Sequence, residues 1–250
     1  EVLWHCSDGS PQPVYDEERD RWLLYTRPPN RALVAKGYYA DFNIKRRVAV
    51  HVGPTPWELG YGRGCIFPEE ECDVRDIDFV TVFKHGTHFI GLLTMMDMDR
   101  EGVNEVHIAT SRDGLSWRRF PHRPVFLPRG EDGAFDAGQA HGPVLAGVFE
   151  GEAVFFYMGT PDGQKVPNAR PGGVGIVRVR EGRFVGMQVD GRGGYLLTRE
   201  LKVTGSRLEV NFEPRDASGF LRVRLLKRDA SARPDTAAPV LEGYDFADCD

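Results

Sequence analysis

The sequence has 250 residues and a formal net charge of −5, and its pI is about 5.9. Its 29 glycines and 17 prolines suit a globular protein with many short strands and turns. No block of Lys and Arg stands out, and no window approaches about 18 consecutive apolar residues. Nucleic acid and membranes are therefore not expected as partners, and a membrane-spanning helix is excluded.

The cysteines are few and contain no C-x-x-C pair; they are Cys6, Cys65, Cys72 and Cys249. This number is too small for a zinc ribbon or a disulfide scaffold, and it favours a cytoplasmic protein with reduced thiols. A secreted protein with a Cys65–Cys72 loop is the alternative. The chain opens on Glu1 without a Met, so we expect both ends to be processed or cut, and localisation cannot be judged from a leader.

The N-terminal part predicts a first group of antiparallel strands. The short runs Pro13–Tyr15 and Trp22–Tyr25 flank a charged turn, Asp16–Arg21. The segment Arg46–Val52 alternates valines with polar or small residues, as a half-buried strand does. Between these runs, Pro28–Ile44 is interpreted as an inserted loop.

Two further groups repeat this texture. In the second, Phe79–Phe83 and His88–Met96 are followed by Glu105–Thr110 and Ser116–Arg119, with polar turns between them. Four strands in about 40 residues is the size of one β-propeller blade. The third group runs from Asp136 to Val185; its expected strands are His141–Phe149, Ala153–Met158, Gly173–Arg180 and Arg183–Val185. Three such groups predict a repeat architecture.

The pattern changes after Gly191–Gly194. The segments Tyr195–Thr204, Arg207–Phe212 and Phe220–Arg228 alternate strictly between polar and apolar residues. This alternation is typical of half-exposed strands in a small β-sandwich. The sequence therefore predicts an all-β chain with propeller blades in residues 1–190 and a β-sandwich in residues 191–250.

An aspartate stands at or just before the expected innermost strand of each group: Asp8, Asp78 (with Asp76 close by) and Asp136. In a propeller these strand entries meet at one end of the axis. Neighbouring carboxylates push their pKa values apart, so that one can donate a proton while another stays anionic, as glycoside hydrolysis requires. The alternative is that each aspartate merely caps a turn or a strand end.

Polar residues on the same expected strands could bind sugar hydroxyls; they are Gln12, Gln139 and His141. The sequence contains no G-x-S-x-G, P-loop, H-E-x-x-H or dinucleotide motif. No cofactor and no defined metal ligand set are predicted, although an Asp and His metal site in the channel is left open. The oligomeric state is unknown from the sequence.

Several strings resemble those of known five-bladed β-propeller proteins, which are grouped with the family 32, 43 and 68 glycoside hydrolases. They are Asp136-Ala137-Gly138, Phe155-Phe156-Tyr157-Met158-Gly159 and the stretch from Ala109 to Trp117, ATSRDGLSW. The tail, with Leu197-Thr198, Arg207–Asn211 and Leu221-Arg222-Val223, resembles the C-terminal β-sandwich of the same proteins. The resemblance implies five blades; since fewer fit before Gly191, one or two N-terminal blades would be absent.

The resemblance also implies hydrolysis or transfer of a glycosidic bond in a furanosyl- or xylosyl-type saccharide. Members of these families use two aspartates and an acidic glutamate, and by position these match Asp8 as base or nucleophile, Asp78 as orienting carboxylate and Asp136 as acid. The third position is thus Asp in place of Glu. The alternatives are a non-catalytic glycan-binding propeller, whose carboxylates would lie further apart than about 5 to 9.5 Å, and an interaction scaffold with an exposed apolar patch.

Overall fold

A computed structural model of the chain describes residues 11–28, 46–68, 76–189, 193–198, 205–214, 218–226 and 240–247. All the regular secondary structure in these ranges is β-strand, which confirms the predicted all-β class. The same ranges hold no helix with the length and apolar character needed to cross a membrane. The chain divides into two compact units, residues 1–184 and residues 185–250.

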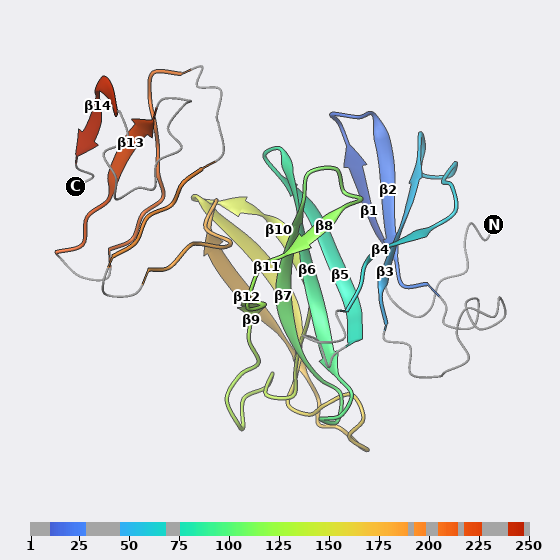
Figure 1. The fold of residues 1–250 in the computed structure, drawn as a ribbon. Helices are drawn as coiled ribbons and strands as arrows, with labels where there is room; N and C mark the ends of the chain where they lie inside the picture. The colour runs from blue at the N-terminus through green and yellow to red at the C-terminus, as the bar shows by residue number, and fades with distance from the viewer. Residues whose placement is uncertain are drawn as a thin grey trace. The chain divides into compact units, whose positions relative to one another are not determined.

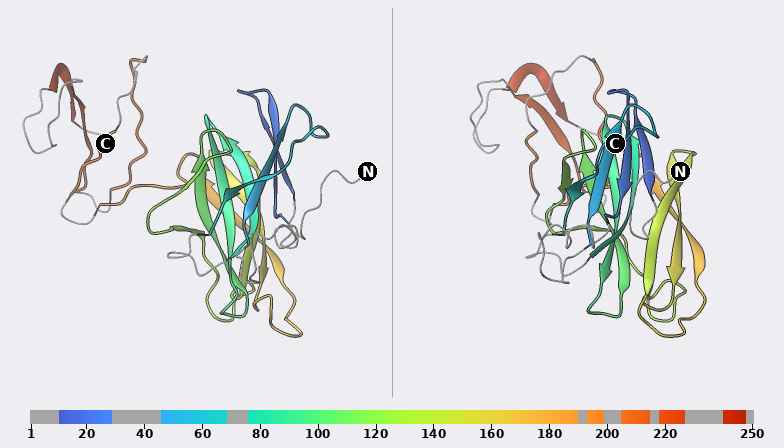
Figure 2. Two further views of the ribbon diagram at one scale, coloured as in Figure 1. Left: turned by 45° about the vertical axis from the view of Figure 1, so that its right-hand side comes forward. Right: turned by 90° about the vertical axis from the view of Figure 1, so that its right-hand side faces the viewer.

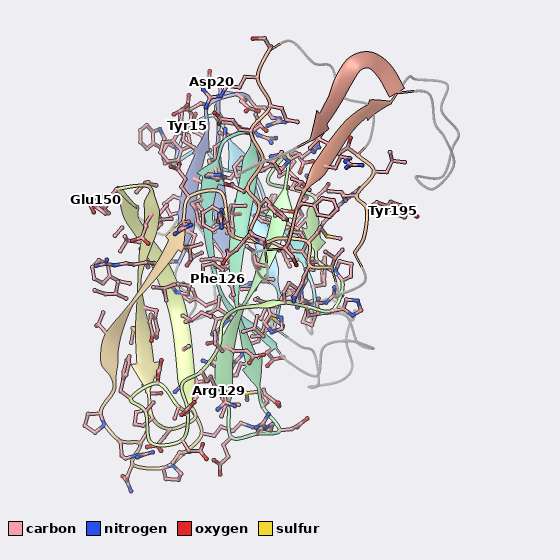
Figure 3. The ribbon with its side chains drawn as sticks, turned by 90° about the vertical axis from the view of Figure 1, so that its left-hand side faces the viewer. Tyr15, Asp20, Phe126, Arg129, Glu150 and Tyr195 are labelled. Atoms are coloured by element: carbon pink, nitrogen blue, oxygen red, sulfur yellow. The ribbon has the colours of Figure 1, made fainter. Side chains whose placement is uncertain are left out.

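The first sheet of residues 1–184 is a four-stranded antiparallel meander in the order β1-β2-β3-β4. Its strands are β1 (Gln12–Asp16), β2 (Arg21–Thr26), β3 (Val48–Gly53) and β4 (Arg63–Ile66). Figure 3 shows Tyr15 and Asp20 together at the turn between β1 and β2, where the tyrosine hydroxyl donates to the carboxylate over 2.6 Å. The predicted hairpin with a charged tip is therefore present.

The second meander packs against both the first sheet and the third meander. Figure 1 shows it between the two, and Figure 2 shows the three meanders from two further sides. Its long strands pair in the order β5-β6-β7, and both β8 and β9 pair with β7. The strands are β5 (Asp76–His85), β6 (His88–Asp97), β7 (Val103–Ser111), β8 (Trp117–Arg119) and β9 (Val125–Leu127). At the β5–β6 turn, Gly86 adopts a φ of +56°, a conformation that glycine accepts without steric cost. All four strands predicted for this segment form.

The third meander consists of β10 (Gln139–Phe149), β11 (Glu152–Thr160) and β12 (Gly173–Arg180). Both residues of the tight turn between β10 and β11 have positive φ, Glu150 at 51° and Gly151 at 77°. This combination is the hairpin geometry that matches strand twist. A single parallel pairing, Gln139 with Asn104, joins β10 to β7 and makes the second and third meanders one eight-stranded sheet.

Two apolar clusters hold the meanders together. The first joins the β1–β4 sheet to the second meander and includes Leu23, Tyr25 and Phe89, which have no exposed surface. The second joins the second meander to the third and is built around Leu92, Val106 and Phe155. Each cluster buries apolar side chains between two neighbouring meanders. Burial of apolar surface is the dominant favourable term in folding.

The third meander is apolar on both faces. One face of β11 carries the buried residues Phe155 and Tyr157. The other face carries exposed apolar side chains in register across all three strands; they are Val144, Phe156, Met158, Val174 and Ile176. An antiparallel sheet with one solvated face normally alternates apolar with polar residues, so this second apolar face departs from the usual pattern.

The described part of residues 185–250 contains one two-stranded sheet, formed by β13 (Arg222–Leu226) and β14 (Val240–Ala247). The prediction of a strand at Arg207–Phe212 is wrong, since these residues have no strand structure. An alternating pattern makes a strand only where a partner strand supplies hydrogen bonds, and here the described residues supply none. The C-terminal β-sandwich, the count of five blades and the domain boundary after residue 190 stay predictions.

Candidate active site

Asp78 lies at a β-bulge in β5. Ile77 pairs with Met95 of β6 and Phe79 pairs with Thr94, so Asp78 is the extra residue between two paired neighbours. A bulge turns the local side chains and is often found beside functional sites. Here the Asp78 side chain is only 8% exposed, so its charge must be balanced by nearby groups.

Two arginines at strand ends of the β1–β4 sheet balance that charge. Arg27, just after β2, donates from Nη1 to Asp78 Oδ1 over 2.5 Å and also to the main-chain oxygen of Asp78 over 3.2 Å. Arg46, just before β3, donates from Nη1 to the same Oδ1 atom over 2.8 Å. Charge-assisted hydrogen bonds of this kind are about twice as strong as neutral ones.

Asp76 belongs to the same cluster through Arg46. The main-chain nitrogen of Arg46 donates to Asp76 Oδ1 over 3.0 Å. The side-chain Nε atom of Arg46 lies 3.9 Å from Asp76 Oδ2. Arg46 therefore links the carboxylates of Asp76 and Asp78, which explains how two negative charges two residues apart are held together.

His141 completes the cluster from β10. Its Nε2 atom lies 3.2 Å from Asp78 Oδ2, the carboxylate oxygen that the arginines leave open. The imidazole also stacks at a tilt against Phe79, with 5.2 Å between ring centroids. Asp78 and His141 were each predicted as site residues, and although 63 residues separate them along the chain, the fold brings them into direct contact.

The electrostatics of the cluster keep Asp78 ionised. Burial alone would raise the pKa of Asp78, because it removes water from the charged form. The hydrogen bond with His141 and the charges of Arg46 and Arg27 outweigh that effect, and the pKa lies below its usual value. Asp78 is therefore suited to orient or stabilise a charged group and poorly suited to donate a proton near neutral pH.

A hollow lies beside the cluster. It is lined by the end of β2 and the starts of β3 and β5, through Thr26, Arg27, Arg47, Val48, Ile77, Asp78, Phe79 and Val80. The hollow is small, with room for about one water molecule, and both polar and apolar side chains line it. No group of three or more His, Cys, Asp or Glu side chains in the described ranges has the arrangement of a metal site.

The other predicted site residues are placed differently. Asp136 is buried, and its Oδ2 accepts a hydrogen bond of 2.7 Å from the Tyr157 hydroxyl. Backbone packs closely around it, since a Cβ atom added to Gly130 would lie 2.2 Å from Asp136 Oδ1. Within the described ranges, Asp136 takes no part in the hydrogen bonds of the Asp78 cluster.

Gln139 forms a separate polar network. Its side-chain amide lies 3.0 Å from the amide of Asn104, and its Nε2 donates to Thr160 Oγ1 over 2.7 Å and to the Asp162 carbonyl over 3.0 Å. These contacts join β10 to β7 and to the end of β11. Gln12 is half-buried at the start of β1, and Asp8 lies outside the described residues.

Sequence reasoning missed Arg27 and Arg46. They are 51 and 32 residues from Asp78 and flank the segment interpreted as an inserted loop. The one available signal was the rule that a buried carboxylate needs a cationic partner, which gives the residue type without its position.

No protein-family model matches this chain. No curated protein sequence matches it either. Among solved structures, it is similar to an N-acetylgalactosamine deacetylase from F. plautii in complex with blood group B trisaccharide. The two are 16% identical, with a TM-score of 0.47, over 68% of this chain and 49% of the other.

Two further similar structures are glycoside hydrolases. One is Zg3597, a family 117 enzyme of the marine bacterium Zobellia galactanivorans, at 14% identity and a TM-score of 0.46, covering 60% of this chain and 47% of that one. The other is a thermostable family-43 enzyme, at 17% identity and a TM-score of 0.40, covering 60% and 40%. The chain thus spans about half the length of the solved structures it matches.

Proposed function

We propose that this chain carries a saccharide site centred on Asp78 and that it hydrolyses or transfers a glycosidic bond of a furanosyl- or xylosyl-type sugar. The observation that carries the proposal is the cluster of one buried, ionised carboxylate with two arginines and a histidine. A carboxylate held in one position by these partners can orient a neighbouring side chain toward a substrate, which is the role given to Asp78.

In this proposal Asp78 is the orienting carboxylate and Asp8 the base or nucleophile. Asp76, Gln12, Gln139 and His141 are proposed to contact the sugar. Asp136 is the proposed acid, although its carboxylate already accepts the Tyr157 hydroxyl and is buried.

A non-catalytic glycan-binding protein is the second candidate. It is favoured by the engagement of both Asp76 and Asp78 with arginine, because such paired carboxylates can position hydroxyl groups without taking part in bond cleavage. The same cluster would then supply hydrogen bonds to a bound sugar.

The test is a panel of aryl furanosides and aryl pyranosides incubated with the complete protein. Turnover by the wild type is expected, and Asp78→Asn should lower kcat/KM by at least about 100-fold, since the carboxylate that orients the site is lost. Asp16→Asn is the matched control because Asp16 is also a buried carboxylate held by arginines, but outside the cluster. Its kcat/KM should be unchanged.

The outcomes separate the two candidates. Saccharide binding that is lost in Asp78→Asn, without turnover of any substrate, would favour the glycan-binding protein. Equal activity in the wild type and Asp78→Asn would overturn the proposed site. Both variants are checked for a cooperative thermal transition before they are assayed.

A further inference from the structure

We propose that His141 is the group that transfers the proton to the leaving oxygen, and that Asp78 acts as its orienting carboxylate. This inference rests on the proposed glycosidase function, and within it the role of acid passes from Asp136 to His141. It is carried by the contact between the imidazole and a carboxylate that two arginines hold in place.

The contact determines which ring nitrogen is available. Nε2 faces Asp78 Oδ2 at 3.2 Å, and an anionic carboxylate can only accept, so Nε2–H is the donor. In the protonated ring the opposite nitrogen, Nδ1, carries the second proton, which is the one that can be transferred. Within the described ranges the imidazole makes no other polar contact, and the side chain is 26% exposed, against 8% for Asp78. His141 can therefore reach a ligand that Asp78 reaches poorly.

The backbone bends directly after His141. The β10–β11 pairing skips from His141 to Val144, and Gly142 has a φ of +55°, which a residue with a side chain rarely adopts. The main-chain nitrogen of Gly142 donates to Thr94 Oγ1 of β6 over 3.1 Å. The bend after His141 is thus anchored to the strand that pairs with the Asp78 bulge.

The charged groups that face His141 come from β5 and from the strand ends behind it. Asp78 contacts the imidazole, and Arg27 and Arg46 lie on the far side of the Asp78 carboxylate. Asp76 lies beyond Arg46. β6 contributes the neutral hydroxyl of Thr94. Since the arginines keep Asp78 ionised, the proton that moves belongs to the imidazole.

The step balances as follows. Protonated His141 gives its Nδ1 proton to the glycosidic oxygen, while the bond from that oxygen to the anomeric carbon breaks and its electron pair stays on the oxygen. Water adds to the anomeric carbon and loses a proton to the carboxylate base of the proposed function, which then releases that proton to solvent. Neutral His141, which keeps Nε2–H toward Asp78, regains a proton from solvent.

The experiment compares leaving groups in wild-type protein and in His141→Gln. A 2,4-dinitrophenyl glycoside needs little protonation of its leaving oxygen, whereas an alkyl glycoside of the same sugar needs a proton donor. We expect His141→Gln to lose about 10²- to 10⁴-fold in kcat/KM on the alkyl glycoside. It should lose less than about 5-fold on the dinitrophenyl glycoside.

Equal losses on both substrates, or no loss, would overturn the role of His141 while the glycosidase function stands. If Asp136→Asn shows the leaving-group dependence instead, Asp136 is the donor. A wild type that cleaves neither substrate overturns the proposed function and this role with it.

A second measurement does not need turnover. Nitrogen-15 NMR of neutral His141 should show the Nε2–H tautomer, and Asp78→Asn should shift the population toward the other tautomer. An unchanged tautomer in Asp78→Asn would contradict the orienting role of Asp78.

Discussion

The hydroxyl of Tyr157 donates a 2.7 Å hydrogen bond to Oδ2 of Asp136, in the interior of the third meander. Burial, followed by this hydrogen bond and the negative charge of Asp136, raises the pKa of Tyr157 to about 12. The hydroxyl therefore stays protonated and can donate throughout the pH range of normal assays. The bond ties the loop before β10 to β11, the middle strand of the third meander.

Removing this hydroxyl should destabilise the protein. Tyr157→Phe leaves the Asp136 carboxylate buried without its donor, which costs about 1–3 kcal/mol in the free energy of unfolding. Tyr15→Phe is the matched control, because its hydroxyl also donates to an aspartate but at an exposed site; its effect should stay within about 0.5 kcal/mol. Urea denaturation measures both, and equal effects would show that the Asp136 contact carries no special weight.

Asp16 should make stability depend on acid pH. Its side chain is fully buried and is contacted by Arg19, Arg21 and Lys84 at 3.2, 3.1 and 3.4 Å. Burial raises the pKa of Asp16, but the hydrogen bonds from these three cations outweigh it, so the pKa is lower in the folded protein. A lowered pKa adds stability above the unfolded value of about 4, which is lost as pH falls through the folded value.

We therefore expect the free energy of unfolding to decrease as the pH is lowered below about 4. Asp16→Asn should lose about 1–3 kcal/mol at pH 7, less than a fully buried pair would, because Arg19 is 39% exposed. Its stability should also change less between pH 5 and 2 than that of the wild type, with Asp78 supplying part of the remaining dependence. Denaturant titrations at several pH values, with exposed Glu18→Gln as control, test this.

Two adjacent phenylalanines on β11 should behave differently. Phe155 has no exposed surface and its ring lies 5.6 Å from the rings of both Phe83 and Phe126. Phe156 points to the opposite face and is 46% exposed. Phe155→Ala should cost about 3–5 kcal/mol, whereas Phe156→Ala should cost about 1 kcal/mol or less. Similar losses measured by denaturation would mean that the open face of the third meander is covered.

The strands of the second meander could be predicted because turn residues and apolar runs agree there. Gly86 at a positive φ ends β5, and the run His88–Met96 became the buried strand β6. The same reasoning failed at Arg207–Phe212, where the alternation is clear but no partner strand lies within the described ranges. Local pattern predicts that a segment can be a strand, and pairing decides whether it becomes one.

The site was only partly predictable for a related reason. Asp78 and His141 could be named because each stands near the start of an apolar strand. Arg27 and Arg46 could not, since they act from strand ends of the neighbouring sheet. The bulges were also invisible, because an extra residue in one strand is defined only by its partner strand.

At those bulges, the site side chains do not depend on the hydrogen bonds that hold the strands together. At each interruption, a side chain from elsewhere takes over a main-chain group: Arg27 binds the carbonyl of Asp78, and Thr94 accepts from the nitrogen of Gly142. An exchange of the side chain at Asp78 or His141 therefore leaves the ladder hydrogen bonds on both sides intact. Related scaffolds could acquire a different reactivity here by replacing one residue, without having to rebuild the strands that carry it.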